Sequence, residues 1–403
     1  MTKLHYPLVS KIFDQEDIKS GIKVLNSKNI TMGKITKKFE NYFKKTLGCK
    51  YSAMTNSGSS AILLILQTLI NPYRKNKLKP GDEVLIPAIC WSTSLWPIIQ
   101  SQLKPVFVDV DKNTLNIDIN DLKKKITKKT KAIMLIHVLG NCTNMSEIIL
   151  IKNKYKLILI EDNCEGLGTK FNNKFLGTFG DFGAYSFYAS HQISGGEGGM
   201  ITCSNFEDYE IIKSLRSHGW SRELSVNKKT IFKPNKNHNK KFTFFNSGYN
   251  LRPTEVSAAI SFSQFKKLRK IKKNRKNNFN KIIKILNKEI ICKKNLYFFN
   301  ENKNVDPCWL AFPIILKNKK INKKIFLEKL YSYGVESRPI ISGDFTLQPA
   351  AKIYNLKKER HKNSRFVHNY GFFIGLSSRN IKNNQLLKIK NSFIKSFEYL
   401  NNL

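Results

Sequence analysis

Hydrophobic residues recur along the chain in short runs that alternate with amphipathic stretches. Four apolar runs, at residues 84–86, 106–108, 133–136 and 157–160, have the length and composition of buried strands. Between them, apolar residues at helical spacing predict helices, for example over 61–70 and 146–155. This alternation continues to about Ser217 and predicts a mainly parallel central sheet with helices on both faces.

The two ends of the chain and one internal segment depart from this pattern. Apolar spacing over 35–43 predicts a helix. Residues 223–243 are rich in Lys and Asn and contain Pro234, which predicts a basic surface loop. A long helix is predicted from Arg252 to about Lys276, and the last third mixes helices with strands such as 309–314. We therefore expect a large domain over 1–260 and a smaller α+β C-terminal domain over 261–403.

Composition narrows the class of protein. The 403 residues are 41% hydrophobic, which is enough for a sizeable core, but no apolar run reaches 18 residues. The first residues lack the apolar stretch of a signal peptide, so we expect a cytoplasmic protein without membrane insertion. Seven cysteines without a Cys-x-x-Cys pair predict buried, reduced thiols and no metal site.

The formal charge of +41 raises the question of a nucleic-acid partner. The lysines are spread along the whole chain, and no helix-turn-helix, zinc-finger or RNP-type motif accompanies them. We therefore expect no nucleic-acid partner, although such a field favours a small anionic substrate.

Two segments carry candidate binding chemistry. Residues 55–61, Thr-Asn-Ser-Gly-Ser-Ser-Ala, place small side chains before a helix, where backbone N–H groups can approach an anion. The same pattern is also that of an ordinary helix cap. Residues 161–165, Glu-Asp-Asn-Cys-Glu, follow a predicted strand, so their carboxylates either enter a ligand crevice or lie in a solvated loop.

A third segment, 186–200, contains two glycine pairs around Glu197. The glycines predict a tight backbone with left-handed positions. His191 lies just before them among hydroxyl side chains. A lone histidine is more often structural, but this setting suits an acid–base group.

In order and spacing, these segments resemble the sugar aminotransferases of the DegT/DnrJ/EryC/StrS type, which are fold type I pyridoxal-phosphate enzymes. The resemblance covers nearly the whole chain and extends to residues 81–84, 109–111, 137–140, 177–181 and 248–252. In the aminotransferases the position of His191 is the lysine that forms an imine with the cofactor, which an imidazole cannot do. The chain therefore resembles the histidine-containing 3-dehydratase branch, as do its segments 216–222 and 337–345.

That branch contains two kinds of enzyme. One acts on a CDP-linked sugar and carries an iron–sulfur cluster, whose cysteines follow the segment matching 216–222. Residues 223–247 contain no cysteine here, so no cluster is expected. The other acts on GDP-linked 4-keto-6-deoxymannose, without a cluster and with L-glutamate as amino donor. This sequence resembles the second kind.

The resemblance also implies roles for individual residues. It implies that pyridoxal 5'-phosphate or pyridoxamine 5'-phosphate is bound noncovalently, with Asp162 pairing with the pyridine nitrogen and Trp91 stacking on the ring. Simple core packing is the alternative for Trp91. The other implied cofactor-binding residues are Gly58, Ser59 and Ser186 at the phosphate, Glu165 near the ring hydroxyl, and Asn250 at the phosphate of a neighbouring subunit.

Candidates for contacts with the glutamate carboxylate or the sugar diphosphate are His218, Arg222 and Arg338. The implied assembly is a homodimer with shared active sites. One departure from the dehydratases is Asp344, which stands where they have asparagine.

We hypothesise that His191 acts first as base and then as acid, so that the carbon-3 hydroxyl of a nucleotide sugar leaves. The product would enter dideoxysugar synthesis for a surface polysaccharide such as lipopolysaccharide O-antigen. Two alternatives stay open. One is an aminotransferase that uses another lysine, although Lys170 and Lys174 lie in a predicted turn. The other is an inactive nucleotide-sugar-binding homologue.

Overall fold

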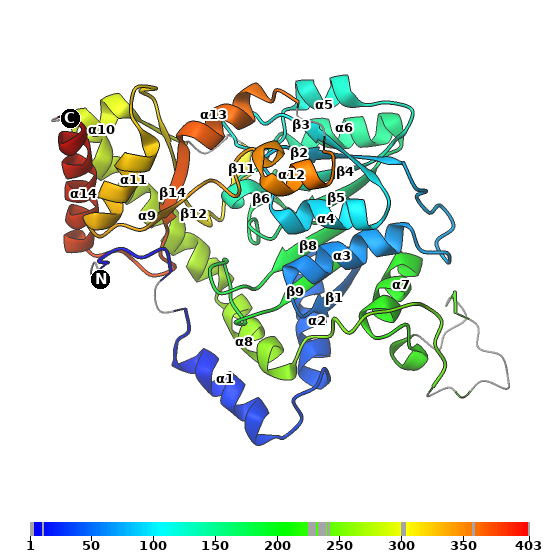
Figure 1. Cartoon of the computed structure of the whole chain (residues 1–403). Helices are drawn as coiled ribbons and strands as arrows, with labels where there is room; N and C mark the ends of the chain where they lie inside the picture. The colour runs from blue at the N-terminus through cyan, green and yellow to red at the C-terminus, as the bar shows by residue number, and fades with distance from the viewer. Residues whose placement is uncertain are drawn as a thin grey trace.

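Seven strands form the central sheet of this computed structural model, which describes residues 4–9, 12–224, 231–232, 239, 242–299, 304–356 and 359–401 (Figure 1). Their order across the sheet is β1 (Tyr51–Thr55), β9 (Gly199–Cys203), β8 (Phe182–Ser186), β5 (Ile158–Asp162), β4 (Thr130–Ile136), β2 (Glu83–Pro87) and β3 (Lys104–Val108). Strand β9 runs antiparallel to the other six strands of this sheet. The predicted mainly parallel sheet and its four strands are confirmed.

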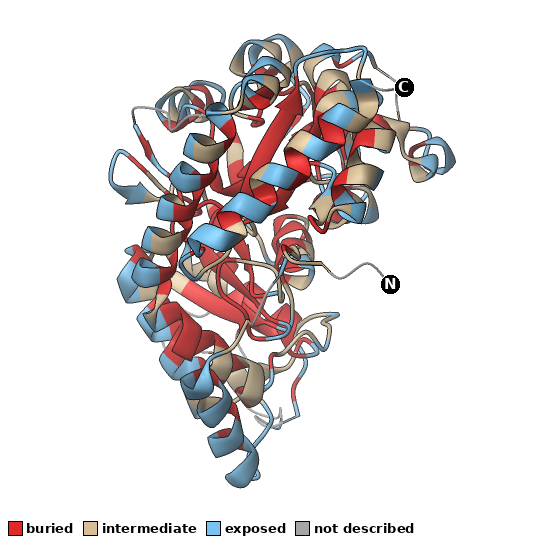
Figure 2. Ribbon diagram, turned by 90° about the vertical axis from the view of Figure 1, so that its left-hand side faces the viewer, coloured by how far each residue is buried: buried red, intermediate tan, exposed pale blue. Residues whose placement is uncertain are grey.

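Alternating residues of the strands pack into different hydrophobic cores on the two faces of the sheet. Ile86 and Ile160 pack with α3 (Gly58–Leu69), α4 (Ser92–Gln100) and α7 (Phe206–Arg216). Their neighbours Leu85 and Leu159 pack with α5 (Ile119–Lys125) and α6 (Met145–Tyr155). Figure 2 shows the result, with buried strands inside and helices that expose only their outer sides. Helices therefore cover both faces, as predicted.

The predicted helix over 35–43 is α2 (Lys34–Leu47), whereas the single helix predicted from Arg252 to Lys276 is wrong. Two helices stand there, α8 (Glu255–Lys266) and α9 (Leu268–Asn287). The break is at Lys267, whose ammonium lies 2.7 Å from carboxylate oxygens of Asp14 and Asp17 at the start of α1 (Gln15–Asn26). This long-range ion pair fixes the junction.

A second, four-stranded antiparallel sheet has the order β10 (Leu296–Phe298), β12 (Ala311–Leu316), β14 (Gly371–Gly375) and β13 (Ser337–Arg338). The strand predicted at 309–314 is β12, two residues further along. Helices α9, α11 (Lys323–Ser332) and α14 (Asn383–Asn401) contribute to the core around this sheet. Tyr6 also lies on it, bridging Val335 and donating to the Gly375 carbonyl at 3.0 Å.

The remaining elements are short. They are β6 (Lys170–Phe171), β7 (Lys174–Phe175), β11 (Val305–Asp306), α10 (Ile290–Asn295), α12 (Pro349–Ile353), α13 (Lys362–Tyr370) and three 3-10 turns at Val138–Gly140, Ser221–Glu223 and Phe345–Leu347. Most of the basic loop predicted over 223–243 lies outside the described residues. Within the described part of the chain, no helix is long and apolar enough to cross a membrane. All seven cysteines are unpaired; five are buried, as predicted, whereas Cys49 and Cys164 are only partly buried.

One buried carboxylate ties the start of α2 to α8. The N-cap of α2 is Gly33, which has no side chain to offer. Glu255 of α8 accepts from the N–H groups of Gly33, Ile35 and Thr36 at 2.7 to 2.9 Å, and from the Thr36 hydroxyl at 2.6 Å. A carboxylate at the positive end of α2 stabilises both helices.

We expect Glu255→Ala to lower the free energy of unfolding by about 1–3 kcal/mol, because four donors lose a buried acceptor. Urea denaturation followed by circular dichroism measures the change. Glu328→Ala on α11 is the matched control, because Glu328 is exposed. Equal stability of the two variants would contradict this role for Glu255.

Candidate active site at the carboxyl edge of the sheet

The carboxyl ends of β1, β5 and β8 meet at one edge of the central sheet. Thr55 and Ser186 both pair with Gly199 of β9, and Asp162 pairs with Ala184 of β8. The loops that follow these strands are the three segments with candidate chemistry. The structure therefore brings them together at the edge where α/β sheets bind ligands.

The first loop leads into the N-terminus of α3. A Cβ atom added to Gly58 would lie 2.6 Å from the Cβ of Ser186, so only glycine allows this close approach. Ser57 caps the helix by accepting from the Ser60 N–H, and the Ser59 hydroxyl donates to Thr93 of α4 at 3.0 Å. The N–H groups of the first turn and the Ser186 hydroxyl together offer an anion site at the positive end of a helix. Gly58, Ser59 and Ser186 are thus neighbours, as the resemblance implies.

Asp162 is buried at the end of β5. Its carboxylate accepts from the Ser94 hydroxyl at 2.6 Å and from the Cys164 N–H at 3.2 Å, and no cation pairs with it in the described residues. Trp91 lies at the start of the same helix as Ser94, and its 56% exposure excludes the alternative that it packs in the core. An unpaired buried carboxylate is a ready partner for a protonated ring nitrogen.

Glu165 lies in the loop after β5, with an ionisation unlike that of a surface carboxylate. Burial raises its pKa to about 7, the N–H of Leu139 at 2.7 Å opposes the rise, and the charge of Asp162 adds to it. Its carboxyl group is therefore partly protonated near neutral pH and can then donate as well as accept.

The loop that carries His191 is closed at its base. Phe187 donates to the Gly198 carbonyl at 2.8 Å, and Gly195 donates to the Phe187 carbonyl at 2.9 Å. Gly196 and Gly198 have φ angles of 80° and 157°, which confirms the predicted left-handed positions. Glutamine 192 anchors the loop, since its amide donates to the carbonyls of Glu165 and Cys308.

The imidazole of His191 is partly buried, and its Nδ1 has no hydrogen-bond partner among the described residues. Its ring meets the exposed Tyr188 edge-on, with centroids 5.9 Å apart. Burial, and after it the positive charge of Arg275, together lower the pKa of His191 to about 4. The imidazole is therefore neutral near pH 7 and able to accept a proton.

The predicted substrate-contacting residues are only partly grouped. The Nε2 of His218 lies 3.2 Å from Arg252, which donates to Asn250 at 3.0 Å. The Leu251 carbonyl accepts from the Asn56 N–H at 3.0 Å, so this group lies beside the anion loop of the same chain. By contrast, the guanidinium of Arg222 stacks over Trp220, and exposed Arg338 pairs with Glu336 at 3.0 Å. No hydrogen bond, ion pair or ring contact within the described residues links Arg222 or Arg338 to His191.

Four other residues singled out in the sequence lie in scaffold or surface positions. Asp344 is fully buried and accepts from Arg365 at 3.1 Å and Thr346 at 2.6 Å, so it holds the scaffold together. Lys170 and Lys174 lie on the β6–β7 hairpin rather than in a plain turn, with their ammonium groups over the rings of Phe175 and Phe179. Glu197 is exposed at the tip of the glycine loop.

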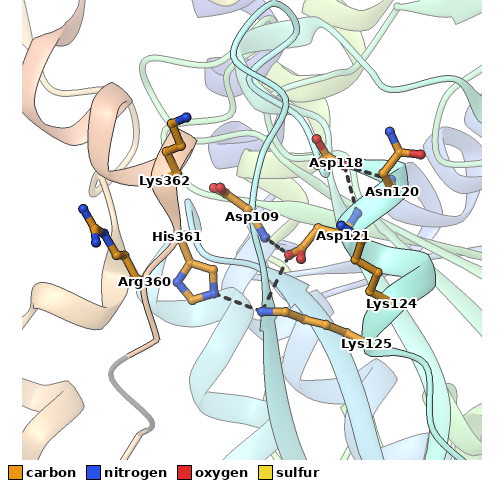
Figure 3. A pocket seen from close by; sticks show the side chains of 9 residues that line it. All are labelled: Asp109, Asp118, Asn120, Asp121, Lys124, Lys125, Arg360, His361 and Lys362. Carbon is orange, nitrogen blue, oxygen red and sulfur yellow. Dashed lines mark hydrogen bonds and ion pairs between the residues drawn. The ribbon is translucent and has the colours of Figure 1, made fainter.

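A hollow of about 230 Å³ lies near the edge strand β3, between α5 and the start of α13 (Figure 3). Its carboxylates already have partners. Asp109 accepts from the N–H groups of Asn363 and Ser364, and Asp118 caps α5. None of the site residues described above lines this hollow.

Sequence reasoning missed three residues of the site: Ser94, Gln192 and Arg275. Arg275 had a readable signal, because it falls on the buried stripe of α9 that also contains Ile271 and Phe279. Ser94 and Gln192 had none, since their partners Asp162, Glu165 and Cys308 come together only through the fold.

Comparison with known proteins agrees with this geometry. The chain is 39% identical over 379 residues to the GDP-4-keto-6-deoxy-D-mannose 3-dehydratase of Escherichia coli O55:H7, covering 92% of this chain and 95% of that one. It is 36% identical over 349 residues to the enzyme of the same name from Yersinia pseudotuberculosis, covering 85% and 86%.

A solved structure of the E. coli GDP-4-keto-6-deoxy-D-mannose-3-dehydratase with bound hydrated PLP superposes with a TM-score of 0.89 at 36% identity, covering 97% of this chain and all of that one. The fold is therefore that of the PLP-dependent aminotransferases. The model of the DegT/DnrJ/EryC1/StrS aminotransferase family matches residues 11–385. The chain belongs to the DegT/DnrJ/EryC1/StrS aminotransferase family.

Proposed function

We propose that this chain is a pyridoxamine-phosphate-dependent nucleotide-sugar 3-dehydratase, which removes the carbon-3 hydroxyl of GDP-4-keto-6-deoxymannose with L-glutamate as amino donor. The observation that carries the proposal is His191, a neutral imidazole in the closed loop after β8. The likeness to two dehydratases of that name over most of their length supports the substrate.

The residues at the sheet edge fit the cofactor. The cradle between Gly58 and Ser186 leaves no room for a Cβ and presents N–H groups to a phosphate. Asp162 has no cation partner in the described residues and would hold a protonated ring nitrogen. Exposed Trp91 is free to stack on the ring, and Asn250 would reach the cofactor phosphate of the neighbouring subunit. When bound, the cofactor supplies an electron sink, which allows the hydroxyl to leave.

Two residues of the chain are proposed to handle protons in the reaction. His191 accepts a proton while its imidazole is neutral, and returns that proton to the departing hydroxyl. Its buried Nδ1 leaves Nε2 as the nitrogen that faces the reaction. Glu165, with a pKa of about 7, holds a proton that it can share in a hydrogen bond. His218, Arg222 and Arg338 are proposed to contact the diphosphate or the glutamate carboxylate.

Two wider features belong to the same proposal. Ile18, Ile22 and Leu25 are exposed on α1, and we infer that a second copy of the chain covers them in a homodimer. The seven unpaired cysteines support a reducing, cytoplasmic location. The aminotransferase alternative is less supported, since Lys170 and Lys174 are held over aromatic rings.

Incubation with pyridoxamine 5'-phosphate, L-glutamate and GDP-4-keto-6-deoxymannose should yield a sugar nucleotide lighter by one oxygen, together with 2-oxoglutarate and ammonia. Mass spectrometry measures the loss of oxygen from the sugar nucleotide, and an ammonia assay measures the ammonia released. We expect His191→Asn to lower turnover by roughly 10²- to 10⁴-fold, because proton transfer is lost. An amino sugar as product would instead support the aminotransferase.

We expect the pH dependence of kcat/KM to fall on the acid side as His191 becomes protonated, toward pH 4. A second limb should appear near pH 7, where Glu165 loses its proton. Glu165→Gln cannot titrate, so the limb near pH 7 should disappear from its profile while the acid limb remains. A limb near pH 7 that persists in Glu165→Gln would assign it to another group.

For the homodimer, we expect Ile22→Asp to increase the monomer fraction, because it places a charge in the contact. Sedimentation velocity at several protein concentrations measures the fraction. Ile290→Asp is the matched control, since Ile290 is exposed on α10 in the small domain. An equal monomer fraction in both variants would show that α1 does not lie in the dimer interface.

A further inference from the structure

A closed circuit of hydrogen bonds surrounds the main chain of His191. Glu165 accepts from the Leu139 N–H at 2.7 Å, and the Leu139 carbonyl accepts from the Leu310 N–H at 2.9 Å. The Leu310 carbonyl accepts from Arg275 at 2.5 Å, and Arg275 also donates to the His191 carbonyl at 3.3 Å. The next residue, Gln192, donates back to the Glu165 carbonyl and closes the circuit.

Arg275 of α9 supplies the positively charged side chain of this circuit. It is buried and donates to three main-chain carbonyls, those of Trp309 at 2.9 Å, Leu310 and His191. Among the described residues no carboxylate pairs with it, and its Nε has no hydrogen-bond partner. A buried guanidinium without a counter-charge is costly. Its place beside the reacting histidine therefore calls for an explanation beyond packing.

Arg275 and His191 also face a common space. Both line a small, partly open pocket of about 40 Å³ between the glycine loop, the N-terminal segment and the residues after β14. Of the described residues that line it, only these two carry titratable side chains; the others are apolar, hydroxyl or amide groups. Among the described residues that line this pocket, no carboxylate offsets the charge of Arg275 at the imidazole.

We propose that Arg275 is a positioning residue for His191, which holds the His191 main chain against the turn at 309–310 and presents a permanent positive charge to the imidazole. The proposal rests on the function proposed above for His191. A positive charge nearby disfavours a second positive charge on the ring. Arg275 thus adds to burial in favouring the neutral form of the imidazole, which can accept a proton.

The other titratable groups around this pair do not compete with it. Tyr188 meets the imidazole from the same loop. Cys308 and Tyr6 face Arg275, and burial raises the pKa of the Cys308 thiol to about 11 and that of the Tyr6 phenol well above its usual range. Both are therefore uncharged near neutral pH. Glu165 touches the circuit through its carbonyl and through the Leu139 N–H.

Two variants separate the charge of Arg275 from its hydrogen-bonding fork. Arg275→Met keeps the length and removes the charge, whereas Arg275→Lys keeps the charge and loses the planar fork. The full-length protein labelled with ¹³C-histidine is titrated by NMR, with the His191 signal assigned by its loss in His191→Asn. Lys273→Met is the matched control, because it removes a positive charge from an exposed position of the same helix.

We expect Arg275→Met to raise the titration midpoint of His191 by on the order of one pH unit, with the acid limb of kcat moving in the same direction. Arg275→Lys and Lys273→Met should leave that midpoint in place. Arg275→Lys should still lower kcat by roughly tenfold to a hundredfold, since the loop is less exactly held.

A folded Arg275→Met whose His191 midpoint equals that of the wild type overturns the proposal and leaves Arg275 with a packing role. If Arg275→Met does not fold, Arg275→Lys decides, and an unchanged kcat overturns the proposal. A wild-type protein without dehydratase turnover, but with the midpoint shift in Arg275→Met, keeps Arg275 as the partner of His191 and overturns the proposed reaction alone.

Discussion

The placement of two consecutive carboxylates at the end of β5 is the constraint on which the site depends. Successive residues of a strand point to opposite faces, so Glu161 and Asp162 have different partners. Glu161 is fully buried and takes hydrogen bonds from His137 at 3.0 Å and, at 2.7 Å each, from the N–H groups of Gly177, Phe179 and Gly180. It fixes the turn before β8. Asp162 is thereby held toward α4 and the ligand edge.

Desolvation then sets the chemistry of the groups beyond that edge. In water a carboxyl group loses its proton at lower pH than an imidazolium. In the loops of this site the order is reversed, because burial disfavours the charged form of each group: it raises the pKa of Glu165 to about 7 and lowers that of His191 to about 4. Environments that push the pKa values of two groups apart leave one group protonated and the other able to accept a proton. The closed loop after β8 is therefore part of the chemistry as well as of the fold.

Much of this could be predicted from local sequence. The strand runs, α2 and the glycine turns depend on neighbouring residues, and each lies where its pattern predicts. The break between α8 and α9 could not, because Lys267 is drawn to Asp14, 253 residues earlier in the chain. The site follows the same rule. His191 and Asp162 stand out in their own segments, whereas Ser94 gains its meaning only from its hydrogen bond to Asp162, 68 residues away.

The role proposed for His191 implies that the side chain at position 191 separates two reactions. A lysine in this loop would meet the burial and the positive charge of Arg275 that act on His191, and both disfavour its ammonium form. Its amine would be neutral and nucleophilic, as imine formation requires. An imidazole in the same surroundings is equally uncharged, but it forms no stable bond to a carbonyl and can only move protons. The environment thus keeps either residue neutral, and the side chain decides whether a covalent bond or a proton transfer follows.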